Sequence, residues 1–122
     1  MATVLVVDDD IYMRDLIARV LEPTRHEVVA EADDGEAGLA AWREHQPDVI
    51  VLDQMMPMMD GLAVAGIVLA EKPTQPIILF TAYPNFTTFR EAEVLGVAAC
   101  VAKTEIDTLP GVIAVVAAEP NV

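Results

Sequence analysis

Residues that can handle a phosphoryl group follow four short apolar runs of the chain. The runs and the residues that end them are 4–7 with Asp8, Asp9 and Asp10, 49–52 with Asp53, 77–80 with Thr81, and 98–102 with Lys103. Short β-branched runs between helical segments are typical of parallel strands buried on both faces, and the carboxyl ends of such strands meet at one edge of the sheet. Open α/β sheets bind their ligands at this edge. We therefore expect the carboxylates, the hydroxyl and the amine to form one site.

Helical segments separate these runs and must position them. Apolar residues recur at near-helical spacing over 11–22, where Arg14, Asp15 and Arg19 are expected on the solvent-facing side, and Pro23 ends the segment. A strand is predicted over 27–32, and further helices over 36–44, 62–71, from Asn85 or Thr87 to Leu95, and over about 109–118. Five strands alternating with five helices predict an α/β fold, a single three-layer (βα)5 unit with a doubly wound parallel sheet. At 122 residues the chain has room for one domain, over 1–122.

Composition and charge exclude several classes of function. The chain carries 20 acidic and 7 basic residues, a net charge of −13, which disfavours direct binding to nucleic acid or to an anionic membrane. A hydrophobic fraction of 54% indicates a folded globular protein, and no uncharged run approaches the ~20 residues of a membrane-spanning helix. The start of the chain lacks the features of a secretory signal, and the single cysteine, Cys100, is expected to be a buried reduced thiol. We expect a cytoplasmic protein.

Three carboxylates gathered in one crevice repel one another, so a divalent cation or protons must neutralise them. For Asp8, Asp9 and Asp53, Mg²⁺ is the natural occupant because it prefers oxygen ligands in a near-octahedral arrangement. A plainer interpretation is that Asp10 caps the first helix while Asp8 and Asp9 are merely solvated. The convergence of Asp53 and Lys103 on the same edge disfavours that interpretation.

Several motifs in order along the chain resemble those of one protein family. They are 5–9, 32–37, Asp53 followed by 56–61, 81–82 and Lys103. On these residues, the chain resembles the receiver domains of two-component response regulators, including single-domain members such as the chemotaxis regulator. The resemblance spans essentially the whole chain. It implies a flavodoxin-like strand order, 2-1-3-4-5, in which the four strands that end at the site residues are neighbours.

The resemblance also implies a phosphoacceptor and a set of metal ligands. Asp53 would take the phosphoryl group from a phosphohistidine or a small acyl phosphate. Asp9 and Asp53 would ligate Mg²⁺ directly, Asp8 would act through a water molecule, and Met55 would contribute its main-chain carbonyl. The chain would be no enzyme beyond catalysing its own phosphorylation and dephosphorylation.

Two more residues and the partners follow from the same resemblance. Lys103 would pair with a phosphoryl oxygen, and the Thr81 hydroxyl would donate a hydrogen bond to it. The implied partners are a histidine kinase or phosphotransfer protein as donor, and a downstream protein partner or effector domain. Two positions depart from the family's pattern, since Cys100 stands where an aromatic residue is common and Thr104 stands where proline is usual.

Two other functions fit part of the pattern. Asp8 and Asp10 match the Asp-x-Asp start of haloacid-dehalogenase-like phosphatases, with Asp8 as nucleophile and Asp10 as general acid, but Tyr12 and the short chain depart from that family. A degenerate receiver that only binds protein partners is the third candidate, and the intact set of acids, hydroxyl and lysine disfavours it. Phosphorylation of Asp53 distinguishes the receiver from both alternatives.

Features outside the carboxylates and the lysine suggest structural roles. The helical segments 62–70 and 111–118 carry no charged residue, and a helix that is apolar all round needs burial on more than one side. We expect at least one of them to form a partner interface or a homodimer, the alternative being small alanines tolerated at the surface. Asp60-Gly61 predicts a turn in which the glycine permits a strained backbone conformation.

Overall fold

The structure is a computed structural model that describes residues 1–118. Its strands are β1 (Thr3–Val7), β2 (Glu27–Ala32), β3 (Val49–Asp53), β4 (Ile77–Thr81) and β5 (Ala99–Ala102). They form one parallel sheet in the order β2-β1-β3-β4-β5. This confirms the doubly wound α/β fold and the 2-1-3-4-5 order.

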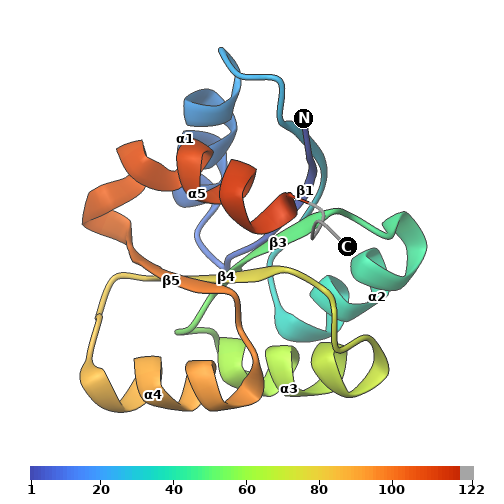
Figure 1. Ribbon diagram of the computed structural model, residues 1–122, viewed down its shortest axis with the longest axis vertical. Helices are drawn as coiled ribbons and strands as arrows, with labels where there is room; N and C mark the ends of the chain where they lie inside the picture. Colours follow the sequence, from blue (N-terminus) through green and yellow to red (C-terminus); the bar gives the residue numbers. More distant parts are fainter. Residues whose placement is uncertain (119–122) are drawn as a thin grey trace.

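Five helices cover the two faces of the sheet. They are α1 (Ile11–Leu21), α2 (Gly35–His45), α3 (Gly61–Glu71), α4 (Phe86–Leu95) and α5 (Leu109–Ala117). Figure 1 shows α1 and α5 on one face and α2, α3 and α4 on the other. The predicted helices are all present, with ends that differ by one or two residues, which is the ordinary uncertainty of helix termini.

Short polar side chains begin four of the helices. Asp10, Asp34, Asp60 and Asn85 precede α1, α2, α3 and α4, and each accepts a hydrogen bond from a backbone amide in the first turn. Such caps satisfy amides that have no partner inside the helix. Of the three aspartates that follow β1, Asp10 therefore has a structural role, and Asp8 and Asp9 are left for the site.

The core consists of two apolar layers, one on each face of the sheet. Along β1, Leu5 and Val7 pack in the layer beneath α2, α3 and α4, whereas Val4 and Val6 pack beneath α1 and α5. All four side chains are buried. Because both faces of the strand are covered, its carboxyl end is held firmly and can position the residues that follow it.

Between β5 and α5 lies a short helical element that was not predicted from the sequence. Residues Lys103–Thr108 form a 3-10 helix, η1, which contains Glu105 in a non-helical conformation. The Thr108 hydroxyl donates a hydrogen bond to the carbonyl of Glu105 at 2.7 Å. Such short 3-10 segments leave no apolar periodicity in a sequence, which explains the omission. Lys103 is thus the first residue of η1 rather than the start of a plain loop.

The amino-terminal edge of the sheet is tied by buried polar contacts. The indole Nε1 of Trp42, near the end of α2, donates to Oε1 of Gln75 at 3.0 Å. The Gln75 amide nitrogen lies 3.3 Å from the carbonyl of Pro47 and 3.1 Å from that of Pro76. These residues precede β3 and β4, so the contacts lie at the end of the sheet opposite to Asp53.

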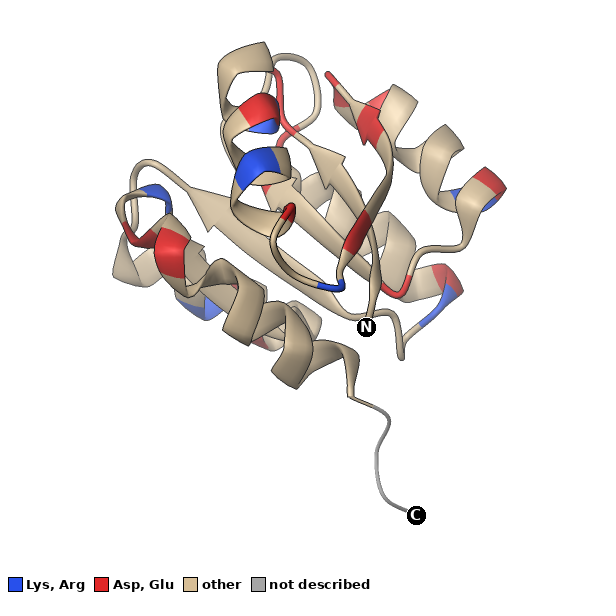
Figure 2. Ribbon diagram, turned by 90° about the horizontal axis from the view of Figure 1, so that it is seen from above, with Lys and Arg blue, Asp and Glu red and all other residues tan. Residues whose placement is uncertain are grey.

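The two charge-poor helices differ in how far they are covered. Helix α3 lies between α2 and α4, and it buries Val64, Ala65, Val68 and Leu69. Its apolar character is therefore largely explained by packing inside the domain. Helix α5 leaves Val115 75% exposed, and Figure 2 shows this helix without charged residues along its length. No helix within residues 1–118 is both long and apolar enough to span a bilayer.

Candidate functional site

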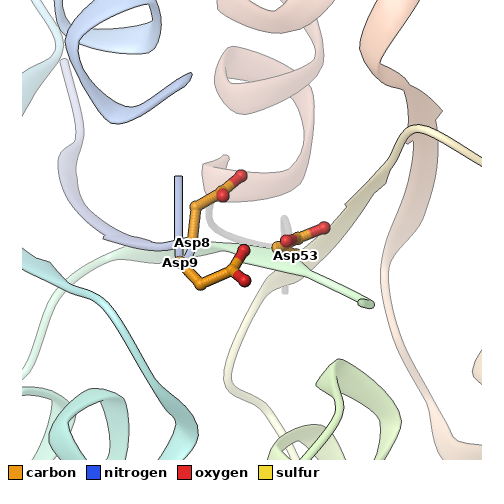
Figure 3. Close-up of side chains that lie close together, drawn as sticks. All are labelled: Asp8, Asp9 and Asp53. Atoms are coloured by element: carbon orange, nitrogen blue, oxygen red, sulfur yellow. The ribbon is translucent and has the colours of Figure 1, made fainter. Parts of the chain in front are cut away.

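Three aspartates meet at the carboxyl edge of the sheet. Asp53 is the last residue of β3, and Asp8 directly follows β1, whose Val7 is paired with Leu52. A carboxylate oxygen from each of Asp8, Asp9 and Asp53 lies within 4.8 Å of the other two. Figure 3 shows the three side chains gathered at the ends of these neighbouring strands. The predicted convergence of the acids is confirmed.

Lys103 supplies a positive charge to this cluster. Its Nζ lies 2.8 Å from Oδ2 of Asp8 and 3.2 Å from Oδ1 of Asp53, and its side chain is only 13% exposed. Since β4 lies between β3 and β5, the lysine side chain must extend across the end of β4 to reach both acids. The strand order therefore explains how residues 50 positions apart in sequence come together.

Burial and mutual repulsion make the charged form of Asp53 costly. The pKa of Asp53 is raised to about 6 as the net result of burial, which is the largest cause, and the negative charge of Asp8, partly offset by Lys103 and the backbone of Met55. For Lys103, burial alone would lower the pKa, but contact with Asp8 and Asp53 outweighs it and leaves that pKa raised. The lysine is thus held as a cation, and the cluster still carries uncompensated negative charge.

The donor set of the cluster suits a hard cation. Oδ1 of Asp8 accepts a hydrogen bond from the amide of Asp10 at 2.9 Å, which fixes the carboxylate. Oδ2 of Asp8 is fully buried and accepts no hydrogen bond of good geometry from the described residues. Its close neighbour is the Lys103 ammonium. A buried carboxylate oxygen with spare acceptor capacity, beside two further carboxylates, fits a metal ion that takes oxygen ligands.

Thr81 and Met55 flank the cluster on adjacent segments. The Thr81 side chain, at the end of β4, is 1% exposed and its Oγ1 accepts a hydrogen bond from the amide of Tyr83 at 3.1 Å. Its hydroxyl proton is therefore directed elsewhere. Met55 lies in the loop after β3, and Met55 and Tyr83 are 59% and 69% exposed.

Gly61 fixes the loop that follows Asp53, for a different reason from the one predicted. It does not adopt a positive φ; instead, a Cβ on Gly61 would lie 2.4 Å from the carbonyl oxygen of Asp53. The Gly61 amide donates to the carbonyl of Gln54 at 3.0 Å, and the Leu62 amide donates to the Gln54 side chain at 2.9 Å. The strained position is Met58, whose φ is 72°.

Arg14 lies beside the site, and the prediction of its exposure was wrong. It was expected on the solvent-facing side of α1, but its side chain is only 14% exposed. The guanidinium donates a hydrogen bond to the main-chain carbonyl of Asp8 at 2.6 Å. Helical periodicity gives the direction in which a side chain leaves the helix, and a long arginine can bend back from there.

Comparison with known proteins places the chain in a family. The model of the response regulator receiver domain matches residues 4–113. Chemotaxis protein CheY of Listeria monocytogenes is 37% identical over 82 residues, which cover 67% of this chain and 69% of that protein. A protein-glutamate methylesterase/protein-glutamine glutaminase of Natronomonas pharaonis is 42% identical over 81 residues, or 66% of this chain. This chain spans only 22% of the length of that relative.

A solved structure agrees with these matches. The signal receiver domain of the response regulator NarL from Mycobacterium tuberculosis has a TM-score of 0.85 and 32% sequence identity, and the superposition covers 97% of this chain and 98% of that chain. The family match includes every residue of the acidic cluster, together with Thr81 and Lys103. The chain therefore belongs to the response regulator receiver domain family.

Proposed function

We propose that this receiver domain is a phosphoacceptor of a two-component system, with Asp53 as the residue that is phosphorylated. The observation that carries the proposal is the position of Asp53, buried at the end of β3 beside Asp8 and Asp9 and in contact with Lys103. A carboxylate oxygen of Asp53 would attack the phosphorus of a phosphohistidine. The new O–P bond forms as the P–N bond breaks, and the imidazole leaves with the bonding electrons and is reprotonated.

Asp8, Asp9 and Asp53 would hold Mg²⁺, with the main-chain carbonyl of Met55 as a further ligand. The carboxylate oxygens within 4.8 Å of one another and the spare acceptor capacity of Asp8 support this assignment. When bound, Mg²⁺ supplies positive charge to the carboxylates and to the transferring phosphoryl oxygens. The raised pKa of Asp53, about 6, shows that its charged form is unfavourable in the metal-free protein, and such a positive charge would stabilise it.

Lys103 and Thr81 would bind the phosphoryl group once it is on Asp53. The ammonium of Lys103 is already 3.2 Å from Oδ1 of Asp53, so a small movement brings it to a phosphoryl oxygen. Oγ1 of the buried Thr81 accepts from the Tyr83 amide, so its O–H points away from that amide and can donate to a phosphoryl oxygen. Hydrolysis by water, which breaks the O–P bond and releases inorganic phosphate, would return the domain to its resting state.

The phosphatase alternative loses support from the position of Asp10. That carboxylate accepts a hydrogen bond from the Tyr12 amide at 2.9 Å and caps α1, so it is committed to the helix rather than available as a general acid. The degenerate receiver is the second alternative, and it predicts a folded protein that takes up no phosphoryl group. Both alternatives are separated from the proposal by locating the modification.

The experiment is treatment with acetyl phosphate or phosphoramidate in Mg²⁺, followed by borohydride reduction of the acyl phosphate and peptide mass mapping. We expect one labile phosphoryl group, located at Asp53, that is absent in Asp53→Asn and absent when EDTA replaces Mg²⁺. Modification at Asp8 would instead support the phosphatase. A folded chain that takes up no phosphoryl group from either donor, or from a histidine kinase, would leave only the binding module.

The partners follow from this function. The phosphoryl donor would be a histidine kinase or phosphotransfer protein, and the phosphorylated domain would act on a downstream protein partner or effector domain. Direct binding to nucleic acid or membrane is disfavoured by the net charge of −13. We place the protein in the cytoplasm, because its single cysteine, Cys100, cannot form an internal disulfide and fits a reducing compartment; the structure shows this residue half-buried rather than fully buried as expected. Residues 1–122 would form one receiver domain.

A homodimer through α5 is the proposed oligomer. Gly111, Ala114 and Val115 form an exposed, uncharged face, whereas α3 is already covered by its neighbours. Sedimentation at micromolar concentration, with and without beryllofluoride as a phosphoryl analogue, should show a dimer that Val115→Lys abolishes. A strict monomer in both states would contradict the homodimer and leave the phosphoacceptor function untouched.

A further inference from the structure

Arg14 connects helix α1 to the strand ends that carry the acidic cluster. Its Nη1 donates to the carbonyl oxygen of Asp8 at 2.6 Å, and its Nε lies 3.3 Å from Oε1 of Glu31 on β2. The Arg14 side chain is 14% exposed, whereas Glu31 is 44% exposed. One guanidinium thus links α1, the residue after β1 and the edge strand β2.

The carbonyl of Asp8 needs such a partner because the neighbouring strand β2 ends at this level and supplies no backbone donor to it. The Asp8 amide donates to the carbonyl of Ala32, the last residue of β2, at 3.0 Å. Beyond that bond β2 offers no further ladder partner. Asp8 is 1% exposed, so its carbonyl would otherwise lie largely away from water. Arg14 satisfies it with a charged donor, which gives a stronger hydrogen bond than a neutral one.

Asp9 lies between two residues whose main chains are fixed. Asp8 is held through its amide, its carbonyl and its Oδ1, which accepts from the Asp10 amide. Asp10 caps α1, and its carbonyl accepts from the Arg14 amide at 3.1 Å. Asp9 is exposed, and its backbone fixes where its Cβ lies and therefore which positions its carboxylate can reach. A contact that holds the peptide between Asp8 and Asp9 therefore keeps the Asp9 carboxylate within reach of Asp8 and Asp53.

We propose that Arg14, anchored by Glu31, is a positioning residue for the metal site: it fixes the peptide between Asp8 and Asp9 and thereby sets the affinity for Mg²⁺. This inference rests on the proposed function, in which Asp8 and Asp9 serve as ligands. Groups that orient metal ligands without touching the metal commonly matter for affinity almost as much as the ligands do. Arg14 acts through Asp8 and Asp9 and contacts neither the metal nor the phosphoryl group.

The charge of Arg14 and its position have opposite consequences for metal binding. A cation near a Mg²⁺ site repels the metal, so if Arg14 acted only through its charge, its removal would tighten Mg²⁺ binding. If Arg14 acts as a positioning group, its removal lets the Asp8 carbonyl and the Asp9 backbone move and would weaken Mg²⁺ binding. The sign of the change therefore separates the two roles.

The test is the dissociation constant for Mg²⁺, measured by calorimetry on wild type, Arg14→Gln and Arg19→Gln. Arg19 is the matched control because it lies on the same helix and has the same charge, but its ion pair with Asp15, 3.0 Å long, is exposed. We expect Arg14→Gln to weaken Mg²⁺ binding by about tenfold, and Arg19→Gln to leave it unchanged or slightly tighter.

A second variant and a second readout distinguish the loss of positioning from a general loss of folding. Arg14→Lys keeps the charge, but one ammonium cannot serve the Asp8 carbonyl and Glu31 in the geometry of a guanidinium, so binding should remain weaker than in wild type. In metal-free protein, the amide resonances of Asp9 and Asp10 should shift in both Arg14 variants and stay in place in Arg19→Gln. Circular dichroism checks that each variant is folded at the temperature used.

Failure of this inference can be told apart from failure of the proposed function. Folded Arg14 variants that bind Mg²⁺ as tightly as wild type, or more tightly, would overturn the inference and leave the phosphoacceptor proposal standing. No Mg²⁺ binding by wild type would overturn the metal site of the proposed function and this inference with it. Weaker binding together with shifted Asp9 and Asp10 resonances supports it.

Discussion

The ammonium of Lys103 and the carboxylate of Asp53 lie 3.2 Å apart across the end of β4. The same ammonium is 2.8 Å from Asp8, so one positive charge serves two buried carboxylates while Asp9 stands beside them. Burial, helped by the negative charge of Asp8, raises the pKa of Asp53 to about 6 and outweighs the contact with this shared lysine.

The stability of the metal-free protein should depend on the ionisation of Asp53. Its folded pKa of about 6 lies above the ordinary value of 3.8, so its contribution to stability is fully present below about pH 3.8 and is lost as the pH rises through about 6. Urea unfolding in EDTA, followed by circular dichroism, should show Asp53→Asn gaining stability relative to wild type over that range. A constant difference between the two proteins from pH 4 to 8 would contradict the assigned pKa.

Opposite shifts are expected when the two neighbours of Asp53 are neutralised separately. Lys103→Met removes a favourable charge and should raise the pKa of Asp53 above about 6, whereas Asp8→Asn removes a repulsion and should lower it. Carboxyl carbon chemical shifts recorded against pH in EDTA measure both. Lys103→Met should also slow phosphorylation by acetyl phosphate by about 100-fold, because a donor to the phosphoryl oxygens is lost. Shifts in the same direction would refute the two-neighbour explanation.

Mg²⁺ should stabilise the wild-type fold and fail to stabilise Asp9→Asn. A ligand that binds only the folded state adds about 2.7 kcal/mol at 100 times its dissociation constant. Asp9 is exposed, so its replacement by the isosteric asparagine should leave the stability in EDTA nearly unchanged. Thermal unfolding in EDTA, Mg²⁺ and Ca²⁺ gives the comparison. Equal stabilisation of both proteins by Mg²⁺ would place the metal elsewhere.

Two glycines of α3 should respond oppositely to alanine. Gly61→Ala places a Cβ 2.4 Å from the carbonyl oxygen of Asp53 and should destabilise the fold by about 2 kcal/mol or more while impairing phosphorylation of Asp53. Gly66→Ala meets no atom within 4 Å, and it should stabilise the helix by roughly 0.5–1 kcal/mol. Urea unfolding of both variants measures the direction of each change in the free energy of unfolding. An active, stable Gly61→Ala protein would show that the loop after Asp53 can move to accommodate the Cβ.

Met58→Gly should stabilise the protein. Met58 has a φ of 72° and a fully exposed side chain, so the strained backbone is relieved without loss of packing. The expected gain is roughly 0.5–1 kcal/mol in the free energy of unfolding. Met55→Gly is the comparison, since Met55 has no positive φ and should lose stability on the same change. A gain for both variants would show that the effect does not come from the backbone of Met58.

The sequence was most informative where local chemistry and tertiary packing agree. Continuous β-branched runs have few alternatives to buried parallel strands, so the ends of β1, β3 and β4 and the acids placed there were predictable. Asp34 and Asp60 could be expected at helix starts because their side chains satisfy free amides. Only the resemblance to receiver domains supplied the strand order, and the direct contact of Lys103 with Asp53 was not predicted at all.

Features that depend on long side chains or close backbone approach were not predictable. Arg14 occupies a helical position whose periodicity indicates solvent, and only the fold reveals that its guanidinium reaches the carbonyl of Asp8. Gly61 suggests a strained turn in sequence, although its role is to let α3 approach Asp53. The buried Gln75 gave no signal, because glutamine is ordinarily a surface residue and its partner Trp42 is 33 positions away.

The indole of Trp42 is fastened to Gln75 at the amino-terminal edge, with the full length of the strands between it and Asp53. As the sole tryptophan of the chain, it dominates the intrinsic fluorescence. Its emission should change sharply when the domain unfolds and hardly at all when the opposite edge is phosphorylated. The protein therefore contains a native optical probe of folding that should not respond to the proposed phosphorylation of Asp53, so an optical probe of that event would have to be introduced elsewhere.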